Sequence, residues 1–574
     1  MTDEKQIGLD RRSLLAGAGA AVAVTAIGGS ASAQPALQWD HETDVLCVGS
    51  GAAACTAAVA AIDGGARAML VEKMPLLGGT TSKSSGVTWI PNHFVLHQQG
   101  IEDRREDCLR YLARYAYPQV YDATSPTLGL TQANYRLLEA FYDNGSAVLD
   151  RLQELDVCRF KQFRLFQVDR PAPDYADHLP ENKVPTGRAM EPAEGSGSRR
   201  GGGSMVEWLR AKHVPVLTET RVTRLLMDNG RVIGAEAESH GRTIRIRARR
   251  SVVFGTGGFS HNVDLCERHQ VALYGSCATP GSTGDFIEIA QEVGAKMGSL
   301  HTAWRTPVLF EHALESRAVA AGVFVLPGDS MIVVNKYGQR VVNEKRDYND
   351  RTMVHFVYDP TREEYPNQLL FMLFDSRSLD AFGGDFPFPL DKREQPYLIE
   401  GQDWDALFTA LGSRLQSLRG KSGGVALAPE FGANTKDAVG RFNNYAAEGK
   451  DPEFDRGLHL YDREWHLLFS AMRKDTKQPV NPHPNVTMHP FSDQGPYYAF
   501  ILAAGSLDTN GGPVINEKSQ VLGRGDKPIP GLYGAGNCIA SPSRTAYYGA
   551  GGTIGLAVTF GFIAGRNAAK EPEI

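Results

Sequence analysis

Short and long apolar runs alternate near the N-terminus. Residues 45–48 form a short apolar run that predicts a buried strand, and residues 52–62 form a longer run that predicts a helix. Residues 68–71 predict the next strand. Near the other end of the chain, residues 556–565 predict another helix. Strands and helices that alternate in this way indicate an α/β fold with helices packed on a sheet.

The middle of the chain has different patterns. Residues 102–160 show the apolar spacing of helices. Short strands are predicted after them at residues 222–227, 232–238, 243–248 and 252–254. Residues 301–486 mix short strands, loops and prolines without any nucleotide-binding motif, so they predict a separate substrate cap.

A glycine-rich turn connects the first predicted strand and helix. It follows the pattern G-x-G-x-x-A, in which Gly49 makes the tight turn, Gly51 lets the backbone approach a pyrophosphate and Ala54 fills a small-residue position. Glu72 ends the next strand 23 positions after Gly49, where a carboxylate can accept hydrogen bonds from ribose hydroxyls. The motif alone also fits an ordinary strand–helix turn. Together with the strand, the helix and the acid in register, it predicts dinucleotide binding.

Two further glycine-rich segments suit the same cofactor. Residues 78–92 combine glycines with Ser and Thr hydroxyls, as in a loop laid along phosphates or a flavin ring. Residues 531–555 let the backbone approach a flat ligand, which the amides at the start of the following helix would face. The expected cofactor-binding residues are Gly49, Gly51, Ala53, Ala54, Glu72, Lys73, Gly79, Thr80, Thr81, Ser82, Gly86, Val222, Gly257, Asp285, Gly536, Asn537, Gly552 and Ile554.

Length, charge and cysteine spacing exclude some classes of partner and site. With 574 residues the chain has length for a large core and two domains. Its formal charge of -6 argues against nucleic acid as the main partner. The seven cysteines show neither CxxC nor metal-ligand spacing, so no metal site is predicted.

The first 33 residues resemble an export signal. Arg11 and Arg12 precede a short, weakly apolar segment at 13–29, and a small-x-small cleavage site ends at Ala33. Paired arginines suit the twin-arginine (Tat) export machinery, which translocates folded proteins with their cofactor bound. The alternative is a membrane anchor, for which the apolar run is short and rich in Gly and Ala. We therefore expect a cleaved signal and a periplasmic enzyme.

Several motifs together resemble one family. The chain is similar to the flavoprotein superfamily that includes fumarate reductase, and within it to the 3-ketosteroid Δ1-dehydrogenases. The segments that carry the resemblance are 49–54, 72–73, 78–82, 173–175, 283–285, 341–348, 531–537 and 547–551. The resemblance implies a Rossmann-like FAD-binding domain of the type with two dinucleotide motifs, at 34–300 and 487–574, and an inserted α+β cap at 301–486. Tyr548 and Ala550 replace prolines of the family's Tyr-Pro-Gly-Pro-Gly, which is expected to loosen this loop.

The resemblance also implies catalytic residues. Tyr348 would take a proton from C2 of a 3-ketosteroid while flavin N5 accepts the hydride from C1. The Tyr547 hydroxyl and the Gly551 amide would stabilise charge on the ketone oxygen. A free phenol titrates near pH ~10, so Tyr348 needs Tyr175 as a hydrogen-bond partner and a positive local potential. Structural roles are the alternatives: Tyr175 in loop packing and Tyr348 as a buried phenol.

Other functions stay open at this point. A fumarate- or urocanate-type reductase would need cationic groups for carboxylates, and Arg544 is a candidate. A dehydrogenase that forms a 4-ene from a 5α-saturated 3-ketosteroid would use much of the same site. A flavin protein that only carries electrons would need no group of tyrosines. For a dehydrogenase, the electron acceptor would be a quinone or a redox protein.

Overall fold

The first sheet positions the glycine-rich turn. The computed structural model describes residues 38–165, 169–193, 203–391, 395–466 and 481–574. Its eight-stranded sheet has the order β18-β19-β11-β1-β2-β8, and β10 and β9 extend it from β11. The strands are β1 (His41–Val48), β2 (Ala68–Val71), β8 (Val216–Leu217), β9 (Thr220–Asp228), β10 (Arg231–Ser239), β11 (Arg242–Phe254), β18 (Gln520–Leu522) and β19 (Pro528–Gly534). β1 pairs in parallel with β2 and β11, which places the turn after β1 in the middle of the sheet.

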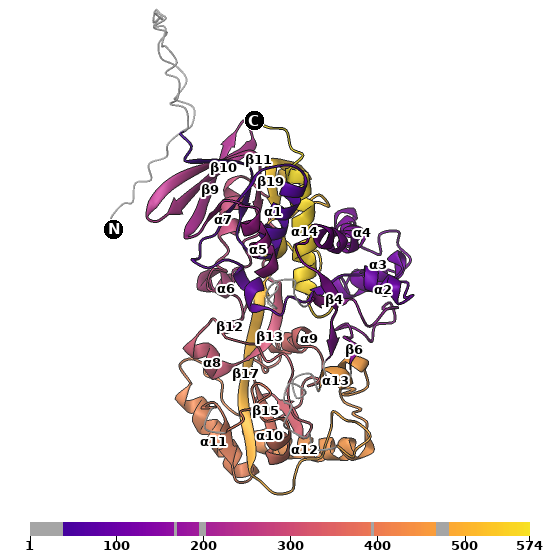
Figure 1. The fold of residues 1–574 in the computed structure, drawn as a ribbon. Coiled ribbons are helices and arrows are strands. Elements are labelled where there is room, and N and C mark those ends of the chain that lie inside the picture. The colour runs from indigo at the N-terminus through magenta and orange to yellow at the C-terminus, as the bar shows by residue number, and fades with distance from the viewer. Residues whose placement is uncertain (1–37, 166–168, 194–202, 392–394, 467–480) are drawn as a thin grey trace, which may run out of the picture. The chain divides into compact units, whose positions relative to one another are not determined.

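Two helices made largely of small residues pack against each other beside this sheet. α1 (Ala52–Asp63) and α14 (Gly552–Ala568) lie side by side, although their sequences are far apart (Figure 1). A Cβ added at Gly561 would lie 2.5 Å from the Ala53 carbonyl oxygen, and one at Gly565 would lie 2.0 Å from that of Ala57. Only glycine permits this approach of the two backbones, so α14 reaches the cofactor motif of α1.

The strands from the middle of the chain form a continuous antiparallel extension. β9 pairs with β10 and β10 with β11, which confirms strands in the predicted ranges 222–227, 232–238 and 243–248. The two strands predicted at 243–248 and 252–254 are one strand, β11, of 13 residues. Its first half pairs with β10, and its last four residues, 251–254, are buried where the strand pairs with β1 and β19. The change from polar to apolar residues therefore marks the entry of one strand into the core, and no turn separates the halves.

A second sheet belongs to the predicted cap. Its strands are β12 (Gly275–Ser276), β13 (Ala303–Leu309), β14 (Met331–Val334), β15 (Leu369–Asp375), β16 (Ile399–Gly401) and β17 (Tyr497–Thr509). β17 is central, because β12, β13, β15 and β16 all pair with it. β12 and β17 lie outside the predicted range 301–486, so that range does not contain the whole sheet. Residues 39–574 form one unit, and the division into domains stays a prediction.

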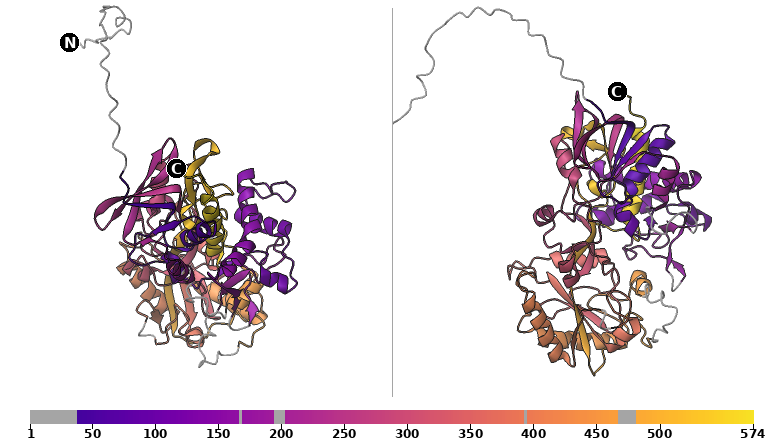
Figure 2. Two further views of the ribbon diagram at one scale, coloured as in Figure 1. Left: turned by 45° about the horizontal axis from the view of Figure 1, so that its top comes forward. Right: turned by 60° about the vertical axis from the view of Figure 1, so that its left-hand side comes forward.

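Both faces of the second sheet are apolar. Along β15, Phe371 and Leu373 join one cluster, which includes Leu407 of α11 (Trp404–Ser417), and Met372 and Phe374 join another on the opposite face. The two views in Figure 2 show helices beside these strands on different sides. A strand covered on both faces has no polar side, which explains why its sequence gives no alternation.

The remaining elements connect and cover these sheets. Up to residue 292 they are η1 (Gly79–Lys83), β3 (Thr88–Trp89), α2 (Phe94–Gln98), α3 (Arg105–Ala116), α4 (Gln132–Glu154), β4 (Phe160–Gln162), β5 (Arg164–Leu165), β6 (Arg170–Pro171), β7 (Ala189–Pro192), α5 (Gly203–Ala211), α6 (Val263–His269) and α7 (Asp285–Glu292). Later elements are α8 (Phe310–Glu315), α9 (Tyr348–Thr352), η2 (Met353–Phe356), α10 (Ser376–Phe382), α12 (Phe431–Glu448), α13 (Leu460–Trp465), η5 (Arg524–Asp526) and η6 (Gly536–Cys538).

Two sequence predictions concern the N-terminus and metals. The predicted export signal at 1–33 lies outside the described residues. Within the described ranges, no helix is both long and apolar enough to cross a membrane. In the same ranges, no group of three or more His, Cys, Asp or Glu side chains is arranged to hold a metal ion.

Candidate active site

The turn after β1 has the geometry that the glycine motif requires. Gly49 has a φ of +102°, and a Cβ there would lie 2.6 Å from the Gly255 carbonyl oxygen. Gly51 precedes α1, so the first amides of that helix point out of the turn. Ala54 packs against Gly255, where a Cβ would lie 2.5 Å from the Ala54 nitrogen. Small residues at these positions therefore bring β1, α1 and the end of β11 together.

A cavity of about 440 Å³ opens above this turn. It has the size of ligand-binding pockets. Of the expected cofactor residues, it is lined by Gly49, Gly51, Ala53, Glu72, Lys73, Gly79, Thr80, Thr81, Ser82, Val222, Gly257, Asp285, Gly536, Asn537 and Ile554.

Three expected residues do not line the cavity. Ala54 faces Gly255, as described above. Gly86 lies in the turn before β3, where its carbonyl accepts from the Thr88 hydroxyl at 3.2 Å. Gly552 faces the Tyr547 ring, which a Cβ would approach to 3.4 Å. These three glycine and alanine positions shape the walls around the cavity.

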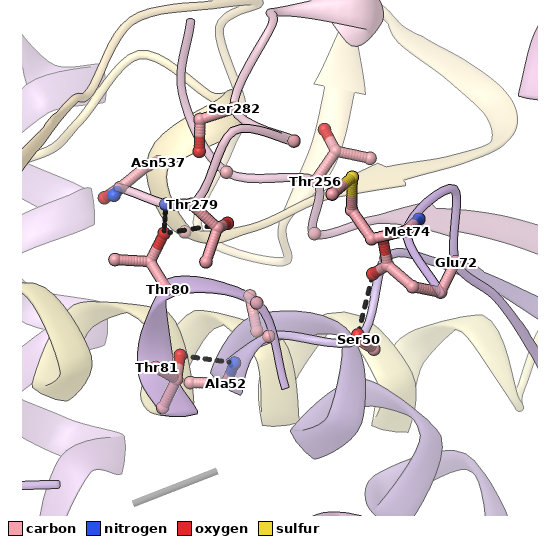
Figure 3. Close-up of a pocket in the computed structure, with 18 of the residues that line it drawn as sticks. Ser50, Ala52, Glu72, Met74, Thr80, Thr81, Thr256, Thr279, Ser282 and Asn537 are labelled. Atoms are coloured by element: carbon pink, nitrogen blue, oxygen red, sulfur yellow. Dashed lines mark hydrogen bonds between the residues drawn. The ribbon is translucent and has the colours of Figure 1, made fainter. Parts of the chain in front are cut away.

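Hydrogen bonds fix the polar wall of the cavity (Figure 3). Ser50 Oγ donates to Glu72 Oε2 at 2.7 Å, and Glu72 Oε1 accepts from the Met74 amide at 2.8 Å. Thr81 Oγ1 accepts from the Ala52 amide at 3.0 Å, which joins η1 to the first turn of α1. A carboxylate at the end of β2 and the backbone amides at the start of α1 match the ribose and pyrophosphate of a dinucleotide.

Sequence reasoning missed several lining residues. Trp304 of β13 lines the cavity, and its Nε1 donates to Asn537 Oδ1 at 2.8 Å. Asp508 of β17 also lines it and accepts from the Gly258 amide at 2.8 Å and from Ser260 Oγ at 2.7 Å. Neither residue belongs to a local motif. Residues 279–282 also line the cavity. They directly precede the Thr283–Asp285 motif, so the sequence offered a local signal for this segment.

The three tyrosines expected at the catalytic centre come together. Tyr175 Oη donates to Tyr348 Oη at 2.9 Å. The ring centres of Tyr175 and Tyr547 are 5.1 Å apart and nearly parallel, and those of Tyr348 and Tyr547 are 5.5 Å apart. The three phenols come from separate segments of the chain. Tyr175 and Tyr348 alone are 173 positions apart in the sequence. All three are buried.

This tyrosine cluster lies directly behind the cavity wall. The Tyr547 ring packs edge-on against Trp304, with ring centres 5.2 Å apart, and its hydroxyl interacts with Thr553. Trp304 and Thr553 both line the cavity. Gly551 caps the start of α14 with a φ of +87°, and a Cβ there would lie 2.3 Å from the Val87 carbonyl oxygen. The Gly551 backbone is therefore fixed against Val87, and the next residue, Gly552, faces the Tyr547 ring.

The electrostatic environment favours the neutral phenols. Burial raises the pKa of Tyr348 well above its ordinary value, and the neighbouring Tyr175 and Tyr547 raise it further. Burial also raises the pKa of Tyr175 and of Tyr547. The hydrogen-bond partner expected for Tyr348 is present, but the expected lowering of its pKa by positive potential is not found.

Tyr548, one of the two departures from the family's loop, has a visible consequence. Tyr548 is buried, its ring lies 5.2 Å from that of Trp89, and its carbonyl accepts from the Tyr175 amide at 3.0 Å. The expectation of a loosened loop is therefore wrong, because the larger side chain anchors it to the core. Arg544 is exposed and stacks over Tyr117 at 5.3 Å. Its side chain does not contribute a cation to the tyrosine cluster.

Comparison with known proteins places the chain in a family. The family model described as "FAD binding domain" matches residues 44–554. The chain belongs to this FAD-binding family. The predicted cofactor, FAD, and the predicted class, an FAD-dependent oxidoreductase, are confirmed. When bound, FAD supplies the redox group, and the cavity residues described above would hold its nucleotide part.

Three relatives that are similar to this chain are named as dehydrogenases of cyclic ketones. The chain is 28% identical to a 4-oxocyclohexanecarboxylate 2-dehydrogenase of Sinomonas cyclohexanicum, over 92% of this chain and 93% of that protein. It is also 28% identical to a 3-oxosteroid 1-dehydrogenase of Mycolicibacterium smegmatis, over 91% and 96%. The crystal structure of the 3-ketosteroid Δ1-dehydrogenase of Sterolibacterium denitrificans matches with a TM-score of 0.72 and 27% identity, over 92% and 99% of the chains. These matches support the FAD-dependent 3-oxosteroid dehydrogenase group and confirm the predicted fold class.

Proposed function

We propose that this FAD-dependent enzyme introduces a C1–C2 double bond into ring A of a 3-ketosteroid. The observation that carries the proposal is the tyrosine cluster of Tyr175, Tyr348 and Tyr547 behind the cofactor cavity. Removal of an α-proton from a ketone needs a base and donors to the ketone oxygen. The pair Tyr175 and Tyr348 would supply the base, and Tyr547 with the Gly551 amide would supply the donors.

The residues have separate tasks in this proposal. The Tyr547 hydroxyl and the Gly551 amide donate to the ketone oxygen and stabilise the charge that develops there. Tyr348, once ionised to the phenolate, takes the proton from C2 and becomes a neutral phenol, and the hydrogen bond from Tyr175 stabilises the phenolate before the transfer. Bound FAD supplies the acceptor for the C1 hydride. Because burial raises the pKa of Tyr348, the small fraction of its phenolate form is expected to limit turnover at neutral pH.

The surroundings of the cluster suit a neutral ring better than a dicarboxylate. Four further aromatic side chains contact it: Trp304, Phe324, Tyr461 and Trp465. Apolar, aromatic walls favour a flat uncharged ring. A fumarate-type reductase would need a cation directed at its substrate. Arg544 is exposed, and the buried guanidinium of Arg351, which interacts electrostatically with Tyr348, donates to the backbone carbonyls of Arg346 and Phe324.

A second candidate substrate is a monocyclic ketone such as 4-oxocyclohexanecarboxylate, on which one relative acts by its name. The observation that favours it is the close packing of the phenols, with Tyr175 stacked on Tyr547 at 5.1 Å and all three rings buried. A single ring needs less space at this cluster than four fused rings.

A substrate panel tests these proposals. Purified holoenzyme is mixed without oxygen with a 3-keto-4-ene steroid, a 5α-saturated 3-ketosteroid and 4-oxocyclohexanecarboxylate, and the flavin absorbance is followed. We expect bleaching by the 3-keto-4-ene steroid and a 1,4-diene product by mass spectrometry. A 4-ene product from the 5α-saturated steroid alone would instead assign 4-ene formation, and bleaching by the monocyclic acid alone would assign the second candidate.

The proposal also covers location and electron transfer. The paired arginines and the small-x-small site support export through the Tat machinery and a periplasmic location. Reoxidation of the flavin would then require a quinone or a redox protein as acceptor.

A further inference from the structure

A buried carboxylate lies at the junction of the segments that carry the tyrosine cluster. Asp174 directly precedes Tyr175 and is 1% exposed. Its Oδ1 accepts from Trp89 Nε1 at 2.7 Å. Its Oδ2 accepts from Arg188 Nη1 at 2.6 Å and from Asn182 Nδ2 at 3.1 Å. Three donors therefore hold this carboxylate, and none of them belongs to the cofactor cavity.

The arginine that holds Asp174 is itself fixed. Asp103 binds Arg188 in a bidentate manner, with Nε donating at 2.8 Å and Nη2 at 2.7 Å. The guanidinium also lies 5.4 Å from the centre of the Trp89 ring. Bidentate, buried ion pairs impose geometry more than they add stability, because their desolvation offsets much of their attraction. The group thus behaves as a rigid clamp on Asp174.

The same tryptophan holds the segment opposite Tyr175. The Trp89 amide donates to the Gly551 carbonyl at 3.1 Å. Gly549 packs on the indole, since a Cβ there would lie 2.6 Å from Trp89 Cδ1. The Tyr175 amide in turn donates to the Tyr548 carbonyl at 3.0 Å. Both sides of the tyrosine cluster are therefore tied to one indole and one carboxylate.

We propose that Asp174, clamped by Trp89 and Arg188, is a positioning residue that sets the Tyr175 hydroxyl relative to Tyr348 and to the ketone-binding pair Tyr547 and Gly551. This role rests on the proposed function. Asp174 does not act on substrate, because its carboxylate is occupied by three protein donors. Loss of the clamp shifts the phenol without removing it, and small displacements of catalytic groups cost up to about 100-fold in rate.

The test is a double-mutant cycle in the holoenzyme. Trp89→Phe removes the indole donor, and Tyr175→Phe removes the hydroxyl that it is proposed to position. We expect Trp89→Phe to lower kcat at least about tenfold, with KM and FAD affinity nearly unchanged, and to have little further effect in the Tyr175→Phe background. Asp174→Asn, which keeps the side-chain shape, should behave in the same way. If the decrease in kcat of the double variant Trp89→Phe/Tyr175→Phe equals the product of the two single decreases, the proposal is overturned.

A matched control and a second measurement complete the design. Trp208→Phe also removes an indole donor, whose Nε1 donates to the Leu155 carbonyl at 2.9 Å. Trp208 has no role in the proposed mechanism, so this variant should leave kcat unchanged. Crystal structures of the wild-type and Trp89→Phe holoenzymes report the Tyr175–Tyr348 hydroxyl contact directly. We expect that contact to be lost in the variant, and an intact contact overturns the proposal whichever substrate is used. Inactivity of the wild-type enzyme toward every ketone would contradict the proposed function alone.

Discussion

Replacing Tyr348 by Phe removes the proposed base and little else. The variant lacks only the Tyr348 hydroxyl, which accepts from Tyr175 at 2.9 Å and also interacts with the Tyr547 hydroxyl. Tyr348 does not line the cofactor cavity, so FAD should bind as in the wild-type enzyme. General base catalysis contributes about 100- to 10,000-fold to a rate, which corresponds to ~3–5 kcal/mol of activation free energy. We expect the rate of flavin reduction by a 3-keto-4-ene steroid to fall by this factor.

The structure also gives the cost in stability. The change leaves the buried Tyr175 hydroxyl without its acceptor, which typically costs ~1–3 kcal/mol. The variant should therefore unfold at a somewhat lower temperature but remain folded at 25 °C, since domains of this kind have ~5–15 kcal/mol of stability. Thermal unfolding of the holoenzyme measures this separately from the rate.

Tyr461→Phe is a matched control for the loss of a buried hydroxyl. The Tyr461 ring packs on Tyr175 at 5.3 Å, and its hydroxyl has no hydrogen-bond partner among the described residues. Removing it should change neither the rate nor the stability appreciably. The assay is anaerobic stopped-flow mixing, with flavin absorbance as the signal. Tyr348→Phe with a flavin-reduction rate within about tenfold of the wild-type rate refutes the assignment of Tyr348 as the base.

The remaining predictions concern the pKa of Tyr348, the hydrogen bond of Thr81 and the paired arginines near the N-terminus. Because burial raises the pKa of Tyr348 above 10, kcat should rise steadily with pH between about 7 and 10 without a plateau, and a bell centred near neutral pH would contradict this. The same raised pKa favours the protonated folded state, so its contribution to stability is present below pH ~10 and should be lost in thermal unfolding at higher pH. Thr81→Val removes the bond to the Ala52 amide, worth ~1 kcal/mol, so FAD should bind about fivefold more weakly in fluorescence titrations, and unchanged affinity would exclude this role. Lysine at both Arg11 and Arg12 should keep the protein in the cytoplasm in cell fractionation, and continued export would contradict a Tat signal.

The sequence predicted the nucleotide half of the site well for a physical reason. The turn at Gly49, the helix after it and Glu72 at the end of β2 lie within a short stretch of chain, so local periodicity and glycine chemistry describe them. The tyrosine cluster is different, because its members meet only through tertiary folding. Motif resemblance predicted those residues, while their spacing alone left structural roles open.

The parts that were missed depend on long-range packing. Trp304 and Asp508 reach the cavity from β13 and β17, which pair with each other across about 200 residues of sequence. Such a contact leaves no local pattern. The Tyr548 side chain also looked like a loosening of its loop, because its anchor, Trp89, lies in a strand near the other end of the chain. The raised pKa of Tyr348 likewise follows from burial that only the fold creates.

Anaerobic mixing of the purified holoenzyme with a 3-keto-4-ene steroid tests the central claim most directly. We expect the flavin band to bleach and the steroid to gain a C1–C2 double bond. An unbleached flavin, together with rapid reoxidation of the reduced protein by fumarate, would contradict it.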